Sequence, residues 1–424
     1  MPSICDIQRE RYIPAPRPHV SAVLGVQYLG HGLRREERLS NEGSSDWVDT
    51  IRVRSSDDNG RSWSDWELQH REWPTQGDCT KEQMPFCNQY DPRSGLTVQM
   101  VFQRVLLGDP EHALAELWKG RRRYYDHGFW QVSADDGRTW SNLRQLTYED
   151  GPVFDPEHWG TPAFLTTNEM YGGYNLITRR NGSLVYPATI PVPYHDEEDR
   201  VVADLANHTG REDHVAGVRC FIGRWNPQRA AYEWTASDPV LVPRRVSWRG
   251  LLEPAVAELT TGAILLEMRG SNTKITPGRK WIAVSKDGGH SWGPVTDLRY
   301  DDGEQFYAPS SFARMIRHSR TSVLYWVGNI SAAPPDRNSP RYPLYIAEVD
   351  ETIPALKRET LTVIDDYDPG HDTPLLQLSN FSLFENRETS EFEAYLTRYG
   401  ERGDGKSYTG DFWTADVYKY VLTF

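Results

Sequence analysis

The chain has 424 residues, enough to bury a large core in two or three ordinary domains or in one β-propeller. Its 15 tryptophans and 22 tyrosines are typical of pleated, half-buried β structure. The formal net charge of -13 argues against binding to a nucleic acid as the main task, because a phosphate backbone would be repelled.

Cysteine spacing and hydropathy exclude further classes of protein. Cys5, Cys79, Cys87 and Cys220 show neither a metal-binding spacing nor a CxxC motif, so we expect free thiols, no metal site and no cofactor. Residues 1–11 lack the apolar stretch of a secretory signal, and no run approaches membrane-spanning length. The sequence therefore predicts a soluble protein without a membrane partner, cytoplasmic unless a leader has been removed.

A short motif, S-x-D-x-G-x-[ST]-W, occurs three times along the chain. The three copies span residues 56–63, 133–140 and 285–292. Each follows an alternating, strand-like run, at residues 50–54, 128–132 and 281–284. The aspartate can accept backbone N–H bonds across a tight turn, and the glycine supplies a positive φ. We therefore expect three β-hairpins whose closing tryptophans, Trp63, Trp140 and Trp292, are buried at the periphery and away from any central channel.

The spacing of the copies predicts how many units the fold contains. The second and third copies lie nearly twice as far apart as the first and second, so a degenerate unit is expected at residues 217–234. Further units are expected at 343–364 and 375–424. Six units of about 70 residues predict one all-β, six-bladed β-propeller over residues 1–424, closed by its N- and C-terminal strands. The polar segment 195–214 is expected to be an inserted hairpin or loop.

Other segments strengthen one family resemblance. Residues 180–188 read R-N-G-S-L-V-Y-P-A, and residues 253–259 read E-P-A-V-A-E-L and lead to a strand ending in Met268-Arg269. Residues 84–96 resemble a second-blade strand of the same family. Together with the repeat, which resembles the Asp-box or BNR repeat, they resemble the sialidase (neuraminidase) superfamily over nearly the whole chain. The resemblance implies a sialidase-like propeller, whereas function depends on residues that face the channel.

The resemblance also assigns binding roles. Sialidases hold the carboxylate of their substrate with three arginines, whose planar forks bind it bidentately. Carried over by position, Arg269 and Arg341 match two of these arginines, and Arg38 lies where another family arginine lies. His158 falls where sialidases place a glutamate that contacts the substrate. It could contact a sugar hydroxyl, act as a base, or simply pack beside Trp159.

The resemblance assigns catalytic roles by position as well. Sialidases use an aspartate as general acid and base, and a tyrosine activated by a glutamate as nucleophile. Glu253 matches the glutamate. Asp46 falls in the loop of the acid, with Asp49 as a near competitor.

Two positions depart from the family pattern. The family opens with R-I-P, whose arginine is one of the three that hold the substrate carboxylate. Residues 11–14 of this chain read R-Y-I-P. Tyr12 therefore takes the place of that arginine, unless a local shift brings in Arg11. Leu378 stands where the nucleophilic tyrosine is expected, and a leucine cannot attack a sugar.

Three functions therefore stay open, all with an acidic carbohydrate as partner. The first is an exo-acting glycoside hydrolase in which Asp46 donates a proton and Glu253 activates a nucleophile or water. The second is a polysaccharide lyase that cleaves next to a uronate, for example of the rhamnose–glucuronate type, with His158 or Tyr12 moving the proton. The third is a glycan-binding propeller without catalysis. For an acidic ligand, Arg269 and Arg341 should share one depression on the propeller axis with Glu253.

Overall fold

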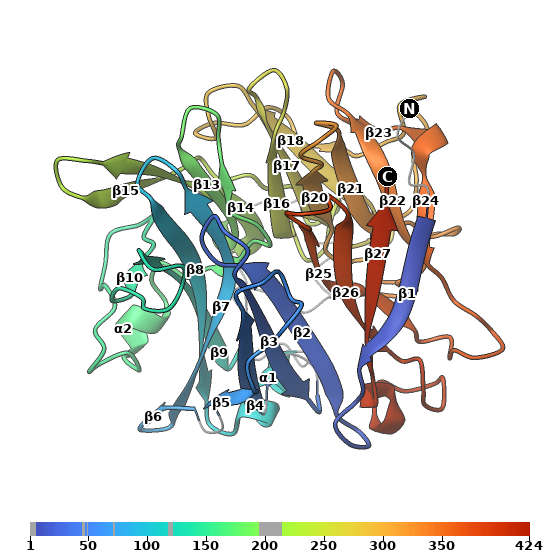
Figure 1. Ribbon diagram of the computed structural model, residues 1–424, viewed down its shortest axis with the longest axis horizontal. Coiled ribbons are helices and arrows are strands. Elements are labelled where there is room, and N and C mark those ends of the chain that lie inside the picture. Colours follow the sequence, from blue (N-terminus) through green and yellow to red (C-terminus); the bar gives the residue numbers. More distant parts are fainter. Residues whose placement is uncertain (1–5, 45–46, 49, 71–72, 118–121, 195–213) are drawn as a thin grey trace.

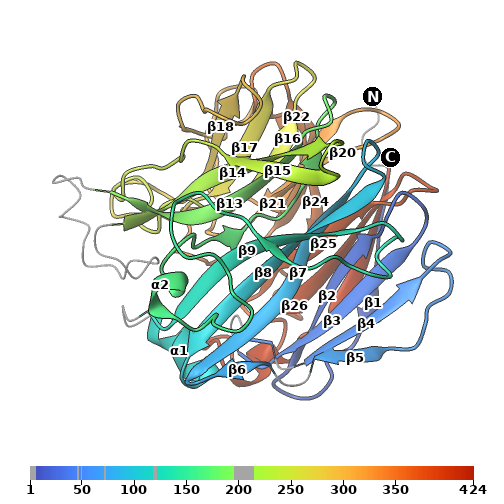
Figure 2. The same ribbon diagram turned by 90° about the vertical axis from the view of Figure 1, so that its left-hand side faces the viewer.

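In the computed structural model (Figure 1), residues 6–44, 47–48, 50–70, 73–117, 122–194 and 214–424 are described. Their strands form six antiparallel sheets set around a common axis (Figures 1 and 2). The predicted all-β, six-bladed propeller is confirmed. The three cysteines in these ranges, Cys79, Cys87 and Cys220, are free, as predicted.

Each blade is one sheet of four or five strands. The first blade comprises β2 (Ser21–Tyr28), β3 (Arg35–Glu42), β4 (Thr50–Ser56) and β5 (Glu67–His70). The second comprises β6 (Thr75–Gln76), β7 (Cys79–Asp91), β8 (Leu96–Leu107), β9 (Tyr124–Ser133) and β10 (Arg144–Gln145). The third comprises β11 (Tyr171–Gly172), β12 (Ile177–Thr178), β13 (Leu184–Pro193), β14 (His214–Asn226) and β15 (Ala231–Ala236). The degenerate unit predicted at 217–234 is the β14–β15 hairpin.

The remaining blades follow the same plan. The fourth comprises β16 (Leu252–Glu258), β17 (Ile264–Arg269), β18 (Lys280–Ser285) and β19 (Thr296–Asp297). The fifth comprises β20 (Arg314–Arg317), β21 (Leu324–Asn329), β22 (Leu344–Asp350), β23 (Ala355–Leu356) and β24 (Thr362–Asp365). The sixth comprises β25 (Gln377–Glu385), β26 (Phe392–Tyr399), β27 (Val417–Thr423) and, from the other end of the chain, β1 (Asp6–Ile13).

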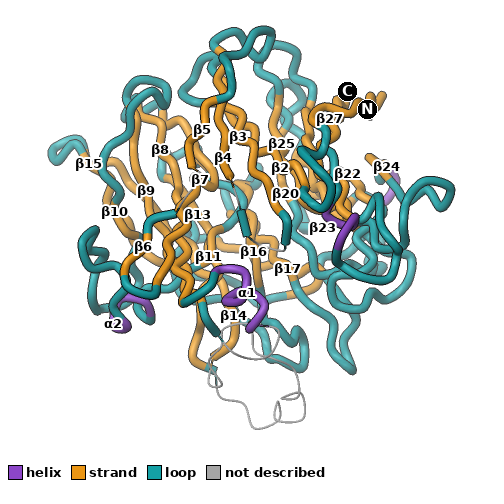
Figure 3. The backbone as a smooth tube through the Cα atoms, turned by 90° about the horizontal axis from the view of Figure 1, so that it is seen from below, coloured by secondary structure: helices purple, strands orange, loops and turns teal. Residues whose placement is uncertain are grey.

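Helices are few and short in the described part of the chain. They are α1 (Pro110–Leu117), α2 (Pro162–Leu165) and the 3-10 turns η2 (Arg358–Thr360) and η3 (Gly410–Trp413). Figure 3 looks at the end of the ring where α1 lies. Among the described residues, we find no helix with the length and apolar character needed to cross a membrane.

The apolar core is divided among the interfaces between neighbouring blades. Successive side chains of a strand point to opposite faces. In β17, Leu265 therefore packs toward the fifth blade, against Trp326, whereas Leu266 packs toward the third blade, against Val218. Trp326 is only 1% exposed. The fourth blade is thus held on both faces.

The three copies of the repeat form the same turn. In the first, Ser56 Oγ accepts the N–H of Gly60 at 2.8 Å, and Asp58 Oδ1 accepts the N–H of Ser62 at 2.8 Å. The N–H of Thr139 makes the equivalent bond to Asp135, and it contributes most to lowering the pKa of that carboxyl to about 2. The tryptophans that close the turns are half-buried, not buried as predicted, because they cover the hairpins from outside: Trp63, Trp140 and Trp292.

Pairing between the two ends of the chain closes the ring. β1 runs antiparallel to β27, from Asp6 opposite Thr423 to Ile13 opposite Val417. In Figure 1 the blue β1 lies beside the red β27. The sixth blade therefore exists only when both ends of the chain are in place.

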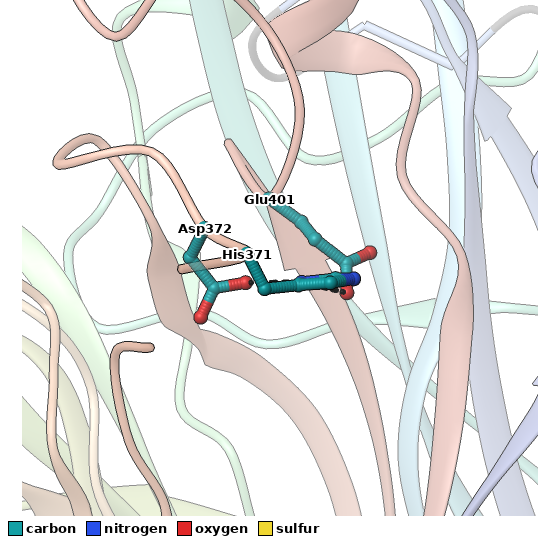
Figure 4. Close-up of side chains that lie close together, drawn as sticks. All are labelled: His371, Asp372 and Glu401. Carbon is teal, nitrogen blue, oxygen red and sulfur yellow. Dashed lines mark hydrogen bonds and ion pairs between the residues drawn. The ribbon is translucent and has the colours of Figure 1, made fainter. Parts of the chain in front are cut away.

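A buried ion cluster ties the fifth blade to the sixth. Arg398 of β26 is 1% exposed and donates to Asp365 at the end of β24 and to both oxygens of Asp372, at 2.7 and 2.8 Å. Its Nε also donates to Glu401 at 3.2 Å. His371 lies beside Asp372 and Glu401 (Figure 4), with its Nδ1 3.1 Å from Asp372 Oδ1. Although this His–Asp–Glu group has the chemistry of metal ligands, Arg398 already compensates its carboxylates.

We expect Arg398→Met to lower the free energy of unfolding by about 3–5 kcal/mol, because it leaves three buried carboxylates without their shared cation. Urea denaturation would measure the loss. The matched control is Arg229→Met, whose partner Glu233 is 3.2 Å away in an exposed pair and which should cost less than about 1 kcal/mol. Equal losses for both variants would show that the cluster does not hold the blades together.

Candidate functional site

A cavity of about 1540 Å³ opens at the centre of the ring. All six blades contribute to its wall, among others through Arg38, Phe86, Thr189, Glu253, Arg314 and Gln377. The site is therefore assembled from segments that are far apart in the sequence.

An ion pair between β16 and β17 forms one side of the cavity. β16 is bulged between Leu252 and Ala255, and Glu253 has a φ of 45°, which is a strained value for a residue other than glycine. The N–H of Glu253 donates to Thr189 Oγ1 at 2.9 Å and fixes this bend. Arg269, at the end of β17, donates from Nη1 to Glu253 Oε2. The bulge thus places a carboxylate in the cavity beside a guanidinium that is only 6% exposed.

Ser310 orients Arg269 and Arg341 together. Its Oγ accepts Arg269 Nε at 2.8 Å, and its carbonyl oxygen accepts Arg341 Nη2 at 3.0 Å. Arg341 Nη1 also donates to Gln377 Oε1 at 3.1 Å and to Ser379 Oγ at 3.0 Å. These acceptors are neutral groups, so they fix the direction of each guanidinium without cancelling its charge.

A third arginine, Arg249, lines the same cavity and is 7% exposed. Burial, and then the charge of Arg269 beside it, lower the pKa of Arg249. Arg341 contributes in the same direction. Sequence reasoning missed Arg249, although it stands only four residues before Glu253. We call Arg249, Arg269 and Arg341 the arginine group.

Two tyrosines lie near Glu253 and the arginine group. Tyr171 and Tyr174 both line the cavity, with their hydroxyl oxygens 3.4 Å apart, and the ring of Tyr174 stacks on Phe312 at 4.1 Å. Burial, and then the charge of Glu253, raise the pKa of Tyr174. A Cβ at Gly173 would lie 2.2 Å from the carbonyl oxygen of Pro187, so only glycine lets the Y-G-G-Y segment lie this close to β13. The paired glycines of this segment were the sequence pattern that could have pointed to Tyr171 and Tyr174 as site residues, and sequence reasoning missed it.

Of the other predicted binding residues, Arg38 lines the cavity but lies apart from the arginine group. Its guanidinium donates to Gln69 and, at 2.9 Å, to Glu36. His158 does not line the cavity. Its side chain is 71% exposed on an outer loop and lies 2.9 Å from Asp155. The structure therefore does not bring His158 together with Glu253.

Tyr12 and Leu378 pack at interfaces between blades. Tyr12 belongs to β1, the outer strand of the sixth blade, and its hydroxyl donates to Glu37 Oε1 at 2.6 Å across the interface with the first blade. It does not line the cavity. Leu378 is fully buried in the core between the fifth and sixth blades. Leu378 contacts the arginine group only through its backbone N–H, which donates to the carbonyl oxygen of Arg341 at 3.0 Å.

Two predictions concern residues outside the described ranges. Asp46 and its competitor Asp49 are among them, although Gly43, Ser44 and Val48 line the cavity. Most of the predicted insertion, residues 195–213, also lies outside, and its last residue, His214, begins β14.

Solved structures share this fold. A protein of unknown function from Dyadobacter fermentans superposes with a TM-score of 0.60 at 12% identity, over 99% of this chain and 100% of its own. The NanB sialidase from Streptococcus pneumoniae gives 0.56 at 12% identity, over 98% of this chain and 70% of its own. The intramolecular trans-sialidase from Ruminococcus gnavus gives 0.52 at 10% identity, over 97% of both chains. No family model and no curated protein matches the sequence. The chain thus has the propeller fold of sialidases, and identities this low show the fold alone.

We expect Glu253→Gln to lower the free energy of unfolding by about 1–3 kcal/mol, because Arg269 loses its buried counter-ion next to Arg249. Added acetate should restore more stability to this variant than to the parent, since a small carboxylate can take the place of Glu253. Thermal unfolding with and without acetate would measure both effects.

The control for this prediction is Glu233→Gln, which alters an exposed pair and should change neither value. A Glu253→Gln variant as stable as the parent, and indifferent to acetate, would contradict the role of Glu253 as the counter-ion of Arg269.

Proposed function

We propose that the protein is a glycoside hydrolase that removes a terminal acidic sugar. The observation that carries this proposal is the arginine group, gathered in one cavity, with Glu253 as the ion-pair partner of Arg269. Guanidinium forks bind carboxylates bidentately, so three of them in one cavity suit an acidic ligand. A sialidase of the same fold, from Trypanosoma rangeli, has been solved with sialic acid, a sugar of this class.

Tyr174 and Glu253 supply the chemistry in this proposal. The raised pKa of Tyr174 keeps its phenol neutral near pH 7, so attack on the anomeric carbon requires a base to take the proton. Glu253 is the carboxylate whose charge acts on Tyr174, and it accepts that proton. The bond from the anomeric carbon to the leaving oxygen breaks as the bond to the tyrosine oxygen forms. Water then cleaves the glycosyl–tyrosine bond, and Glu253 returns the proton to Tyr174.

Asp46 remains the proposed proton donor to the leaving oxygen. Its described neighbours Ser44 and Val48 line the cavity, which supports this role. After the first step its carboxylate can take a proton from the attacking water.

A lyase acting next to a uronate is the second candidate. The observation that favours it is Leu378, which is buried in the core at the position where the family has its tyrosine. The arginine group could neutralise the uronate, and Tyr171 with Tyr174 could transfer the proton. The named enzymes among the solved structures of this fold are sialidases, which favours the hydrolase.

We expect Tyr174→Phe and Asp46→Asn each to lower kcat at least about 100-fold while substrate binding stays nearly unchanged, because each removes one transferred proton. The assay would use a panel of sialylated and glucuronate-capped oligosaccharides, with products identified by mass spectrometry and near-ultraviolet absorbance. The controls are His158→Ala and Tyr12→Phe, which alter polar residues outside the cavity.

The product decides between the candidates. A saturated acidic sugar supports the hydrolase, and an adduct on Tyr174 in quenched enzyme supports the covalent step. An unsaturated uronate would replace the hydrolase with the lyase. Binding across the panel without any cleavage would leave a glycan-binding propeller.

A further inference from the structure

A cluster of aromatic side chains from the sixth blade borders the same cavity. Tyr408, Phe412 and Trp413, which we call the aromatic shelf, lie at and just before η3. Phe412 contacts both of the others edge-on, with ring centroids 5.1 Å from Tyr408 and 5.0 Å from Trp413. It also stacks in parallel with Tyr399, with centroids 6.2 Å apart. The shelf is therefore a continuation of the packed core around Tyr399.

The outer members of the shelf stay accessible. Phe412 is 3% exposed, whereas Tyr408 is 46% exposed and Trp413 is half-buried, and all three line the cavity. Trp413 Nε1 donates to the carbonyl oxygen of Tyr408 at 3.0 Å, which fixes the two residues relative to each other. Rigid aromatic rings that stay exposed on a cavity wall are typical of a binding site.

A hydrogen bond joins Tyr399, against which the shelf packs, to the first blade. The hydroxyl of Tyr399 donates to Glu42 Oε2 at 2.6 Å. Glu42 and the residues that follow it, Gly43 and Ser44, also line the cavity and lead into the loop of the proposed proton donor. The arginine group, in contrast, comes from the stretch that enters the fourth blade, from that blade itself and from the fifth blade. Because the acidic sugar is terminal in the proposed function, the next sugar of the substrate is attached through the leaving oxygen.

We propose that the aromatic shelf binds the sugar next to the acidic one, on the leaving-group side, by stacking the C–H face of a pyranose on Tyr408 and Trp413. This inference rests on the proposed function. The cavity, at about 1540 Å³, exceeds the range of about 300–1,000 Å³ that is usual for a small ligand, so it has room beyond one ring. The neighbouring charge is the carboxylate of Glu42, which disfavours a second acidic sugar and favours a neutral one with hydroxyls to donate. The shelf thus makes the substrate an oligosaccharide rather than a small glycoside.

Binding to the Asp46→Asn variant, in which cleavage is blocked, tests the shelf. The probes are two pairs, sialic acid with 3′-sialyllactose and glucuronic acid with a glucuronate-capped trisaccharide, and calorimetry gives Kd for each. For the preferred pair we expect the longer sugar to bind about tenfold more tightly than its monosaccharide. Tyr408→Ala and Trp413→Ala, each added to Asp46→Asn, should remove this gain and leave the Kd of the monosaccharide unchanged. The unchanged value also shows that the variant has folded.

Tyr408→Phe is the matched control, because it keeps the ring and should keep the gain. The proposal that the shelf binds a sugar is overturned if both members of each pair bind equally, or if the gain in affinity survives both alanine variants. In either case, binding of the monosaccharide leaves the proposed function standing. If Asp46→Asn binds none of the four probes, the proposed function fails and the shelf fails with it.

Discussion

A ring of six sheets exists only if its first and last blades meet, and here the N-terminal strand β1, paired with β27, completes the last blade. Every part of the cavity wall depends on this closure, because the wall takes side chains from all six blades. The interface next to β1 is reinforced by a polar network in which Tyr12 and Arg54 both bond to Glu37, a carboxylate that is fully buried. Tyr12 therefore has a structural task at the closure, which explains why a tyrosine fits where the family pattern has an arginine.

Once the ring is closed, its centre concentrates charge. Arg269 and Arg341 share Ser310, and the carbonyl oxygen of the next residue, Ser311, accepts a bond from the buried Lys280. Behind them Glu267 is 1% exposed, and burial raises the pKa of its carboxyl while it lowers that of Lys280. Layers of opposite charge thus alternate from the cavity into the fourth blade. Such fixed groups need little rearrangement when a ligand arrives, which is the condition for strong electrostatic binding in a partly dry site.

The fold could be read from the sequence because its main signal is local. The turn around Asp58 needs only eight consecutive residues, and its recurrence gave the size and number of the blades. Glu253 and Arg269 were also found, since they lie on adjacent strands of one blade. Arg249, Tyr174 and Ser310 were missed because their role depends on how separate blades meet. The assignment of His158 rested on a position in a loop, and loops of the same blade differ most in length and direction between proteins that share a fold.

The position of the arginine group within an acidic protein has a kinetic consequence. With a net charge of -13, the molecule as a whole repels an anion at long range, while the arginine group, in the proposed function, attracts it at short range. At low ionic strength the approach of an acidic ligand is therefore slowed. Because the screening length is about 10 Å at 0.1 M salt, added salt removes the distant repulsion before it weakens contacts inside the cavity. Association should thus become faster as salt is added, the reverse of the steering seen when a whole protein surface carries the charge opposite to that of its ligand.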